Sequence, residues 1–397
     1  MITTLNPGTR LRNRYQIIKL LGRGGQCIVY LTYDQFTGKS LVVKCLINNA
    51  QSPQDRAQNL QLFMKEQVFL SKLDHPSLPK GYEYFQEGGY HYIAVEFVPG
   101  QSMEQILKRS SSPIPEKQSI DWGIELAKTL VYLSHQKPHP IIIRDIKPSN
   151  IQITPDNKAK LIDFTIAREW KDRGQDTVRM GSPGYAAPEQ YKGRSDIRSD
   201  IYSLGVTLYE ILTKKDPSEN PFNFPPIRQI NPNISEELEK ILLKAMETNA
   251  DQRYQNPKEM LEDLKSLVEM QNMSALDKAA KFFTMGEEEF KLKNYKKALE
   301  HYENALKCEP DIGEYLCRIG ETRYALGNSD KGLMEIYKGF TLRFKGILSP
   351  LQINKIREKY ESIKKQMVTS WPMFSNNLAR TSNQAFETEL SAPLTSG

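Results

Sequence analysis

The first hundred residues contain short apolar runs of the kind that form β-strands. We predict strands over residues 15–21, 28–33, 41–47 and 90–97, with a turn over residues 36–39 that leads into the third strand. This part of the chain is therefore expected to be rich in β-structure.

One helix interrupts these predicted strands, over residues 59–73, where apolar residues recur with helical spacing. One face of this helix collects Leu62, Glu66, Leu70 and Leu73. A carboxylate among apolar side chains is costly unless it is paired, and Lys44 is the natural partner of Glu66. The alternative is that Glu66 only borders the apolar stripe.

Beyond residue 98 the pattern becomes helical. Val98-Pro99-Gly100 breaks the chain as a hinge would. A helix is predicted over residues 116–136, and several more between residues 200 and 270. The sequence Ser235-Glu236-Glu237-Leu238 has the residues of a capped helix start.

Residues 274–345 show an internal repeat. The first copy matches the tetratricopeptide spacing at Phe282, Met285, Gly286, Phe290, Tyr295, Ala298, Tyr302, Ala305 and Pro310. The second copy follows 34 residues later, with the first-helix pattern at Leu316, Ile319, Gly320, Tyr324 and Gly327. It then weakens, because Gly332 and Gly339 take its later small-residue positions and its final proline is absent. The alternative is an ordinary helical hairpin. Residues 368–397 lack periodicity and are expected to be disordered.

Composition excludes several classes of protein. A length of 397 residues predicts two or three domains, and the net charge of +6 is dispersed, so we expect no nucleic-acid partner. The chain has no run of about 20 apolar residues that could span a membrane, and its first residues are unlike a secretory signal. The cysteines form no CxxC pair, so a metal site or disulfide framework is not expected; they are Cys27, Cys45, Cys308 and Cys317. A reducing cytoplasm fits this composition.

The candidate chemistry lies in residues 143–150, Ile-Arg-Asp-Ile-Lys-Pro-Ser-Asn, and 163–165, Asp-Phe-Thr. Asp145 can accept a proton from an attacking hydroxyl, and Lys147 can hold negative charge beside it. Asn150 and Asp163 offer hard oxygen ligands suited to Mg²⁺. Each residue alone is common, but their joint spacing is not.

These motifs resemble the catalytic loop and metal motif of the protein-kinase family. Further matches follow the family's chain order: residues 21–29, 41–44 and Glu66 upstream, and 181–189, 200–205 and Arg253 downstream. The resemblance covers residues 10–270 and is greatest to the bacterial serine/threonine kinases. It implies an α+β bilobal fold, with a small β-rich lobe and a large helical lobe.

The resemblance implies an ATP site in the small lobe and the hinge. Its residues would be Leu21, Gly22, Arg23, Gly24, Gly25, Gln26, Cys27, Val29, Val42, Lys44, Glu96 and Val98. The glycines would let backbone N–H groups approach the phosphates, while Glu96 and Val98 would offer backbone groups to the base. Val95 would stand at the back of the pocket.

The catalytic residues implied are Asp145, Lys147, Lys44 and Glu66, and the metal ligands are Asn150 and Asp163. Lys147 and Ser182 resemble the residues that favour serine or threonine acceptors. Glu189 and Arg253 resemble the family's structural ion pair beneath the activation segment. Asp200 resembles the buried helix aspartate that holds the catalytic-loop backbone. Arg144 would receive a phosphate on the activation segment, with Thr177 as the acceptor; the alternative is that Arg144 pairs with a carboxylate such as Asp176.

Four positions depart from the family pattern. Cys27 replaces the third glycine of the loop, Ile143 replaces a histidine, Thr165 replaces a glycine, and Gln152 is polar where the adenine floor is expected. Cys27 is interpreted as a tolerated small residue rather than a redox-sensitive thiol. Ile143 can keep the packing against Phe164, whereas Thr165 narrows the freedom of the backbone.

The predicted function is therefore Mg²⁺-dependent transfer of phosphate from ATP to proteins, with the helical repeats recruiting a protein partner. Two alternatives remain open. A pseudokinase scaffold is disfavoured because Lys44, Glu66, Asp145, Asn150 and Asp163 are all present. A small-molecule kinase is disfavoured by Ser182 and residues 187–189, Ala-Pro-Glu, which argue for a protein acceptor.

Overall fold

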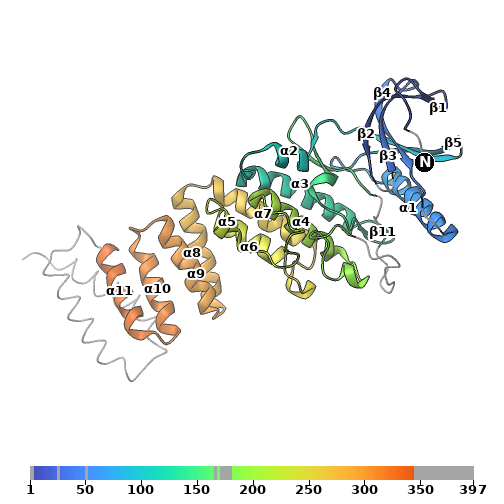
Figure 1. Ribbon diagram of the computed structural model, residues 1–397. Coiled ribbons are helices and arrows are strands. Elements are labelled where there is room, and N and C mark those ends of the chain that lie inside the picture. Colours follow the sequence, from blue (N-terminus) through green and yellow to red (C-terminus); the bar gives the residue numbers. More distant parts are fainter. Residues whose placement is uncertain (1–3, 25–26, 50–51, 165–167, 170–180, 344–397) are drawn as a thin grey trace, which may run out of the picture. The chain divides into compact units, whose positions relative to one another are not determined.

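The computed structural model describes residues 4–24, 27–49, 52–164, 168–169 and 181–343. The chain divides into two compact units, Met1–Glu269 and Met270–Gly397. The first unit contains a β-sheet lobe and a helical lobe, and the described part of the second unit is helical (Figure 1).

The small lobe is built on an antiparallel sheet with the strand order β1-β2-β3-β4-β6-β5. Its strands are β1 (Arg10–Leu11), β2 (Tyr15–Arg23), β3 (Cys27–Asp34), β4 (Lys39–Leu46), β5 (Gly81–Glu87) and β6 (Tyr90–Glu96). The four predicted strands are present. The strand β5 was not predicted, because Phe85 is its one fully buried side chain and its hydrophobic pattern is therefore weak.

Helix α1 (Pro53–Lys72) lies against this sheet and starts earlier than predicted. Ser52 caps it by accepting a hydrogen bond from the backbone N–H of Asp55 at 3.0 Å, and Pro53 occupies the first turn. The expected start at residue 59 was wrong because the first turns are polar and carry no apolar stripe. Glu66 is on the buried face, together with Phe63 and Phe69 rather than Leu62, which is half-buried.

The large lobe is organised around α4 (Ile197–Thr213), which is buried on almost every side. The other helices of this lobe are α2 (Met103–Arg109), α3 (Glu116–Ser134), α5 (Ile227–Ile230), α6 (Glu236–Ala245) and α7 (Pro257–Asn272). The predicted capped start is present, because Ser235 accepts a hydrogen bond from the backbone N–H of Leu238 at 3.3 Å. A helix that is apolar all round belongs in a core, and α4 contacts α3, α5 and α6.

Short strands and 3₁₀ turns occur in the connections that precede and join the helices of the large lobe. The strands are β7 (Gln101–Ser102), β8 (Ile141–Ile142), β9 (Ile151–Ile153), β10 (Ala159–Leu161) and β11 (Arg168–Glu169). The 3₁₀ turns are η1 (Pro148–Asn150), η2 (Gln190–Lys192) and η3 (Ala250–Gln252). Strands β10, β9 and β7 form one antiparallel sheet, and β11 pairs with β8.

The second unit contains helices α8 (Ala275–Lys291), α9 (Tyr295–Cys308), α10 (Gly313–Ala325) and α11 (Ser329–Arg343). Consecutive helices contact one another. Small residues make this packing possible: a Cβ at Gly286 would lie 2.5 Å from the ring of Tyr302, and one at Gly320 would lie 2.4 Å from the backbone oxygen of Gly332. Gly320 and Gly332 therefore allow α10 and α11 to approach closely. Among the described residues, no helix is long and apolar enough to cross a membrane.

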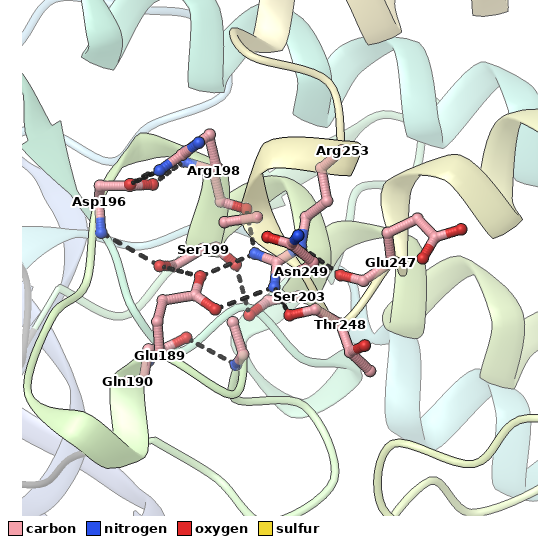
Figure 2. A network of polar contacts seen from close by, with 12 residues as sticks. Glu189, Gln190, Asp196, Arg198, Ser199, Ser203, Glu247, Thr248, Asn249 and Arg253 are labelled. Atoms are coloured by element: carbon pink, nitrogen blue, oxygen red, sulfur yellow. Dashed lines mark hydrogen bonds and ion pairs between the residues drawn. The ribbon is translucent and has the colours of Figure 1, made fainter.

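A buried ion pair joins two loops of the large lobe (Figure 2). Arg253 donates to both carboxylate oxygens of Glu189, at 2.7 and 2.9 Å, and Ser199 donates to the same carboxylate at 2.7 Å. The remaining donors of Arg253 reach the backbone oxygens of Glu247 and Thr248. Burial alone would raise the pKa of Glu189, but the bonds from Arg253 outweigh burial and lower it. The Glu189 carboxylate is therefore ionised at neutral pH.

Replacing Arg253 by methionine should lower the free energy of unfolding by about 3–5 kcal/mol, because it leaves the Glu189 carboxylate buried without its cation. Chemical denaturation followed by circular dichroism measures this change. Lys258→Met is the matched control, since its ion pair with Glu262 is exposed and should contribute about 0.5 kcal/mol or less. Equal effects of the two substitutions would contradict the structural role given to Arg253.

Candidate active site

Lys44 lies on the central strand β4 of the small-lobe sheet, and its side chain is on the face toward α1. It is opposite Val29 on β3 and Ile93 on β6. Along β4 the side chains of Val43 and Cys45 belong to the core on the other face of the sheet, so Lys44 and Val42 share the face toward α1. The sheet thus presents Val29, Val42 and Lys44 together.

The ammonium group of Lys44 forms an ion pair with Glu66 of α1, and its Nζ lies 3.7 Å from Oδ1 of Asp163. Glu66 is fully buried and Lys44 nearly so. Burial alone would lower the pKa of Lys44, but the charges of Glu66 and Asp163 outweigh burial and raise it. The expected Lys44–Glu66 pair is therefore present, and Glu66 does not merely border the apolar stripe.

A second polar cluster surrounds Asp145. Ser182 donates to its Oδ1 at 2.7 Å, and the Nζ of Lys147 lies 2.8 Å from its Oδ2. Lys147 also donates to the Ser182 hydroxyl at 2.5 Å. The catalytic loop and the segment after residue 180 are therefore linked through one carboxylate, one ammonium group and one hydroxyl.

Asn150 completes this cluster and is oriented by it. Its Nδ2 donates to the backbone oxygen and to Oδ2 of Asp145, both at 2.9 Å. Both donors of the amide point at Asp145, and the Ser149 hydroxyl donates to Oδ1 of Asn150 at 3.4 Å. An amide oxygen has two lone pairs, so Oδ1 can still serve as a hard oxygen ligand. Asp163 offers a carboxylate that is about one-third exposed, at 37%.

The side-chain oxygens of Asn150 and Asp163 fit Mg²⁺ that is bound together with phosphate. In the described part of the chain, no three His, Cys, Asp or Glu side chains gather as a metal site of their own. Mg²⁺ in phosphate-transfer sites typically takes one or two protein carboxylates and completes its shell with phosphate and water. Asn150 and Asp163 could supply the protein share of such a shell.

Asp200 of α4 holds the backbone of the catalytic loop. Its two carboxylate oxygens accept hydrogen bonds from the backbone N–H groups of Ile143 and Arg144, both at 2.8 Å. Arg144 has a positive φ of 69°, a conformation that costs free energy unless neighbours hold it. Burial raises the pKa of Asp200 to about 7, although these bonds oppose the shift. The role expected for Asp200 matches this geometry.

The glycine-rich loop joins β2 to β3. Gly22 and Arg23 end β2, and Gly24 donates its backbone N–H to the backbone oxygen of Cys27 at 2.9 Å. Leu21 is exposed on the same strand, whereas Gly25 and Gln26 lie outside the described residues. Burial raises the pKa of Cys27 to about 12, so its thiol stays protonated at neutral pH. This agrees with Cys27 as an inert small residue.

The hinge follows β6. Glu96 is the last residue of the strand, and its backbone N–H donates to the backbone oxygen of Lys80 at 2.8 Å. Val95 and Val98 are buried. Gly100 has a φ of 125°, and a Cβ there would lie 1.9 Å from the backbone oxygen of Ile153. Only glycine fits where the hinge crosses β9.

Two departures from the family pattern have a structural counterpart. Ile143 and Phe164 are both buried in the main core, as expected from an isoleucine that keeps the packing. Gln152 is half-buried and lies in register with Ser102 on one side and Lys160 on the other. Thr165 and the expected phosphate acceptor Thr177 lie outside the described residues, as do its neighbours Lys171, Arg173, Asp176 and Arg179.

Sequence reasoning missed Gln190. This buried side chain donates to the backbone oxygen of Arg144 at 2.9 Å and accepts from the backbone N–H of Ala187 at 3.0 Å. It therefore ties the catalytic loop to the segment that contains Glu189. Its position directly after Ala187-Pro188-Glu189 is the one signal that could have drawn attention to it.

Comparisons with known proteins agree with this geometry. The family model described as protein kinase domain matches residues 15–279. A probable serine/threonine-protein kinase of Streptomyces coelicolor is 33% identical over 287 residues, which cover 67% of this chain and 42% of the relative. The serine/threonine-protein kinase PknB of Mycolicibacterium smegmatis is 34% identical over 277 residues, which cover 64% of this chain and 43% of that kinase. The chain thus spans about two-fifths of the length of these relatives.

The fold also matches a solved structure. The kinase domain of Mycobacterium tuberculosis PknI aligns with a TM-score of 0.53 and 23% sequence identity, over 66% of this chain and 99% of that domain. This likeness supports the bilobal fold. The family match, the two relatives and the clusters around Lys44 and Asp145 lead to one conclusion. The chain belongs to the protein kinase family.

Proposed function

We propose that this chain is a non-specific serine/threonine protein kinase, which transfers the γ-phosphate of ATP to hydroxyl groups of protein substrates. The observation that carries the proposal is the cluster of Asp145, Lys147 and Ser182, in which one carboxylate is held by an ammonium group and a hydroxyl. Such a carboxylate is placed to orient an acceptor hydroxyl and to take its proton.

The other site residues have roles that follow from their contacts. Lys44, held by Glu66, would bind the α- and β-phosphates, and the backbone of residues 21–27 would cover the triphosphate. Val29 and Val42 would contact the base from the sheet, while the backbone of Glu96 and Val98 would hydrogen-bond it. Mg²⁺, when bound at Asn150 and Asp163, would neutralise phosphate charge.

Asp145→Asn should lower kcat by orders of magnitude and leave the affinity for ATP nearly unchanged, because Asp145 accepts the proton but does not hold the nucleotide. Steady-state kinetics with casein, together with calorimetric titration of ATP, separate the two quantities. Asp121→Asn, an exposed aspartate on α3, is the control. Wild-type turnover by the Asp145→Asn protein would show that Asp145 is not the base.

We also propose that phosphorylation of Thr177 switches the enzyme on, with Arg144 receiving the phosphate through paired hydrogen bonds. Autophosphorylated protein should carry phosphate on Thr177 in mass spectrometry, and Thr177→Ala should slow turnover severalfold. Ser111→Ala, in an exposed loop, should have no effect. Full activity of Thr177→Ala would refute this switch.

Residues 274–345 are proposed to be tetratricopeptide-like repeats that recruit a protein partner or substrate. The described catalytic groups all come from residues before 270, and α8–α11 form helical hairpins with small residues at the repeat positions. Helical repeats of this kind present extended surfaces to other proteins.

A chain that ends near residue 272 should therefore keep its activity on casein but lose its preference for its natural target. Circular dichroism verifies that the shortened protein is folded, and a kinase assay with both acceptors compares them. If the shortened protein is folded but does not turn over ATP, then the helical unit is part of the catalytic machinery rather than a recruiting element.

A further inference from the structure

The carboxylate of Glu96, at the start of the hinge, contacts two donors, the backbone N–H of Lys80 and the ammonium group of Lys160. Its Oε2 accepts the backbone N–H of Lys80 at 3.1 Å, and its Oε1 lies 3.9 Å from the Nζ of Lys160. Both side chains are partly shielded, with 34% of Glu96 and 23% of Lys160 exposed. Lys160 belongs to β10 of the large lobe, so this ion pair crosses from one lobe to the other.

The same place joins a third segment, the connection between α1 and β5. The backbone N–H of Leu161 donates to the backbone oxygen of Ser77 at 3.0 Å, next to Lys160. Earlier in this connection, the backbone N–H of Asp74 donates to the Tyr132 hydroxyl at 2.9 Å. The connection is therefore bound to α3 and to β10, in addition to the hinge.

Each of the three segments leads directly to a candidate site residue. The connection follows α1, which holds Glu66, and β10 runs through Ile162 to Asp163. Glu96 itself begins the hinge. A change in the distance between Lys160 and Glu96 would therefore move the hinge relative to the strand that positions Asp163.

The sheet geometry explains why Lys160 points this way. Its neighbours Ala159 and Leu161 are buried in the core of the large lobe, so Lys160 lies on the opposite face. Gln152 and Ser102 occupy the same row of this sheet, one residue from each strand. Gln152, the polar residue at the expected adenine floor, is thus the middle member of a polar row across this sheet that ends at Lys160.

We propose that Lys160 is a positioning residue. It holds the hinge through Glu96, so that the hinge can contact the base of a nucleotide while Asp163 is in position near its phosphates. The inference rests on the proposed function, because it concerns the same nucleotide site. Replacing Lys160 by methionine removes its ion pair with Glu96 but keeps the backbone groups that form the neighbouring hydrogen bonds.

Lys160→Met should raise the Kd for ATP with Mg²⁺ about two- to fivefold, the change expected from losing a partly exposed ion pair. The kcat at saturating ATP should change less than the Kd, since no reacting group is touched. Lys160→Arg should restore the affinity. Lys158→Met is the matched control: it stands two residues earlier and pairs with Glu125, away from the hinge.

A double-mutant cycle with Glu96→Gln tests whether the two residues act as a pair. The Kd of the double variant for ATP should be no higher than that of the single variant that binds ATP less tightly. Hydrogen exchange without nucleotide should be faster across residues 96–98 in Lys160→Met than in wild type or Lys158→Met.

An unchanged Kd in Lys160→Met, additive effects in the cycle, or unchanged exchange at the hinge would each overturn the proposal. These readouts do not depend on phosphate transfer. If the wild-type protein binds ATP but phosphorylates nothing, the proposed function fails while the cycle still decides the role of Lys160. If it binds no ATP, hydrogen exchange decides alone.

Discussion

The burial of the Lys44 ammonium group is the constraint on which the arrangement of the site depends. A buried cation is costly without a partner, and here the partners come from two other elements, Glu66 on α1 and Asp163 after β10. The helix must therefore be docked on the sheet, and the large lobe must approach, for the charge to be compensated. One ion-pair cluster thus links the order of the small lobe to the position of the candidate metal ligand.

The large lobe also contains a buried charged residue whose partners come from another segment, Asp200 on α4. Asp200 is buried but accepts two backbone N–H groups, and it thereby supports Arg144 in its left-handed conformation directly before Asp145. The ion pair between Arg253 and Glu189 holds the segment that leads into Gln190. These groups need not touch a substrate to matter, because they hold the backbone from which Asp145, Lys147 and Asn150 project.

The fold and the site could be predicted from the sequence where local pattern and motif spacing carry the information. The strands around Lys44 follow from apolar runs, and the Lys44–Glu66 pair follows from a carboxylate on an apolar helix face. The start of α1 was missed because its first turns are polar, although Ser52 and Pro53 are a recognisable start signal. Contacts such as Gln190 with Arg144, or Lys160 with Glu96, join residues far apart in the chain and have no local signature.

If the proposed function is right, these groups perform phosphate transfer rather than only preserve a fold. Incubation of the full chain with radiolabelled ATP, Mg²⁺ and casein, followed by phosphoamino-acid analysis, tests it most directly. We predict label on phosphoserine or phosphothreonine, and none when Mg²⁺ is removed by a chelator. A folded protein that binds ATP but transfers no label to any acceptor would contradict the account and favour a pseudokinase scaffold.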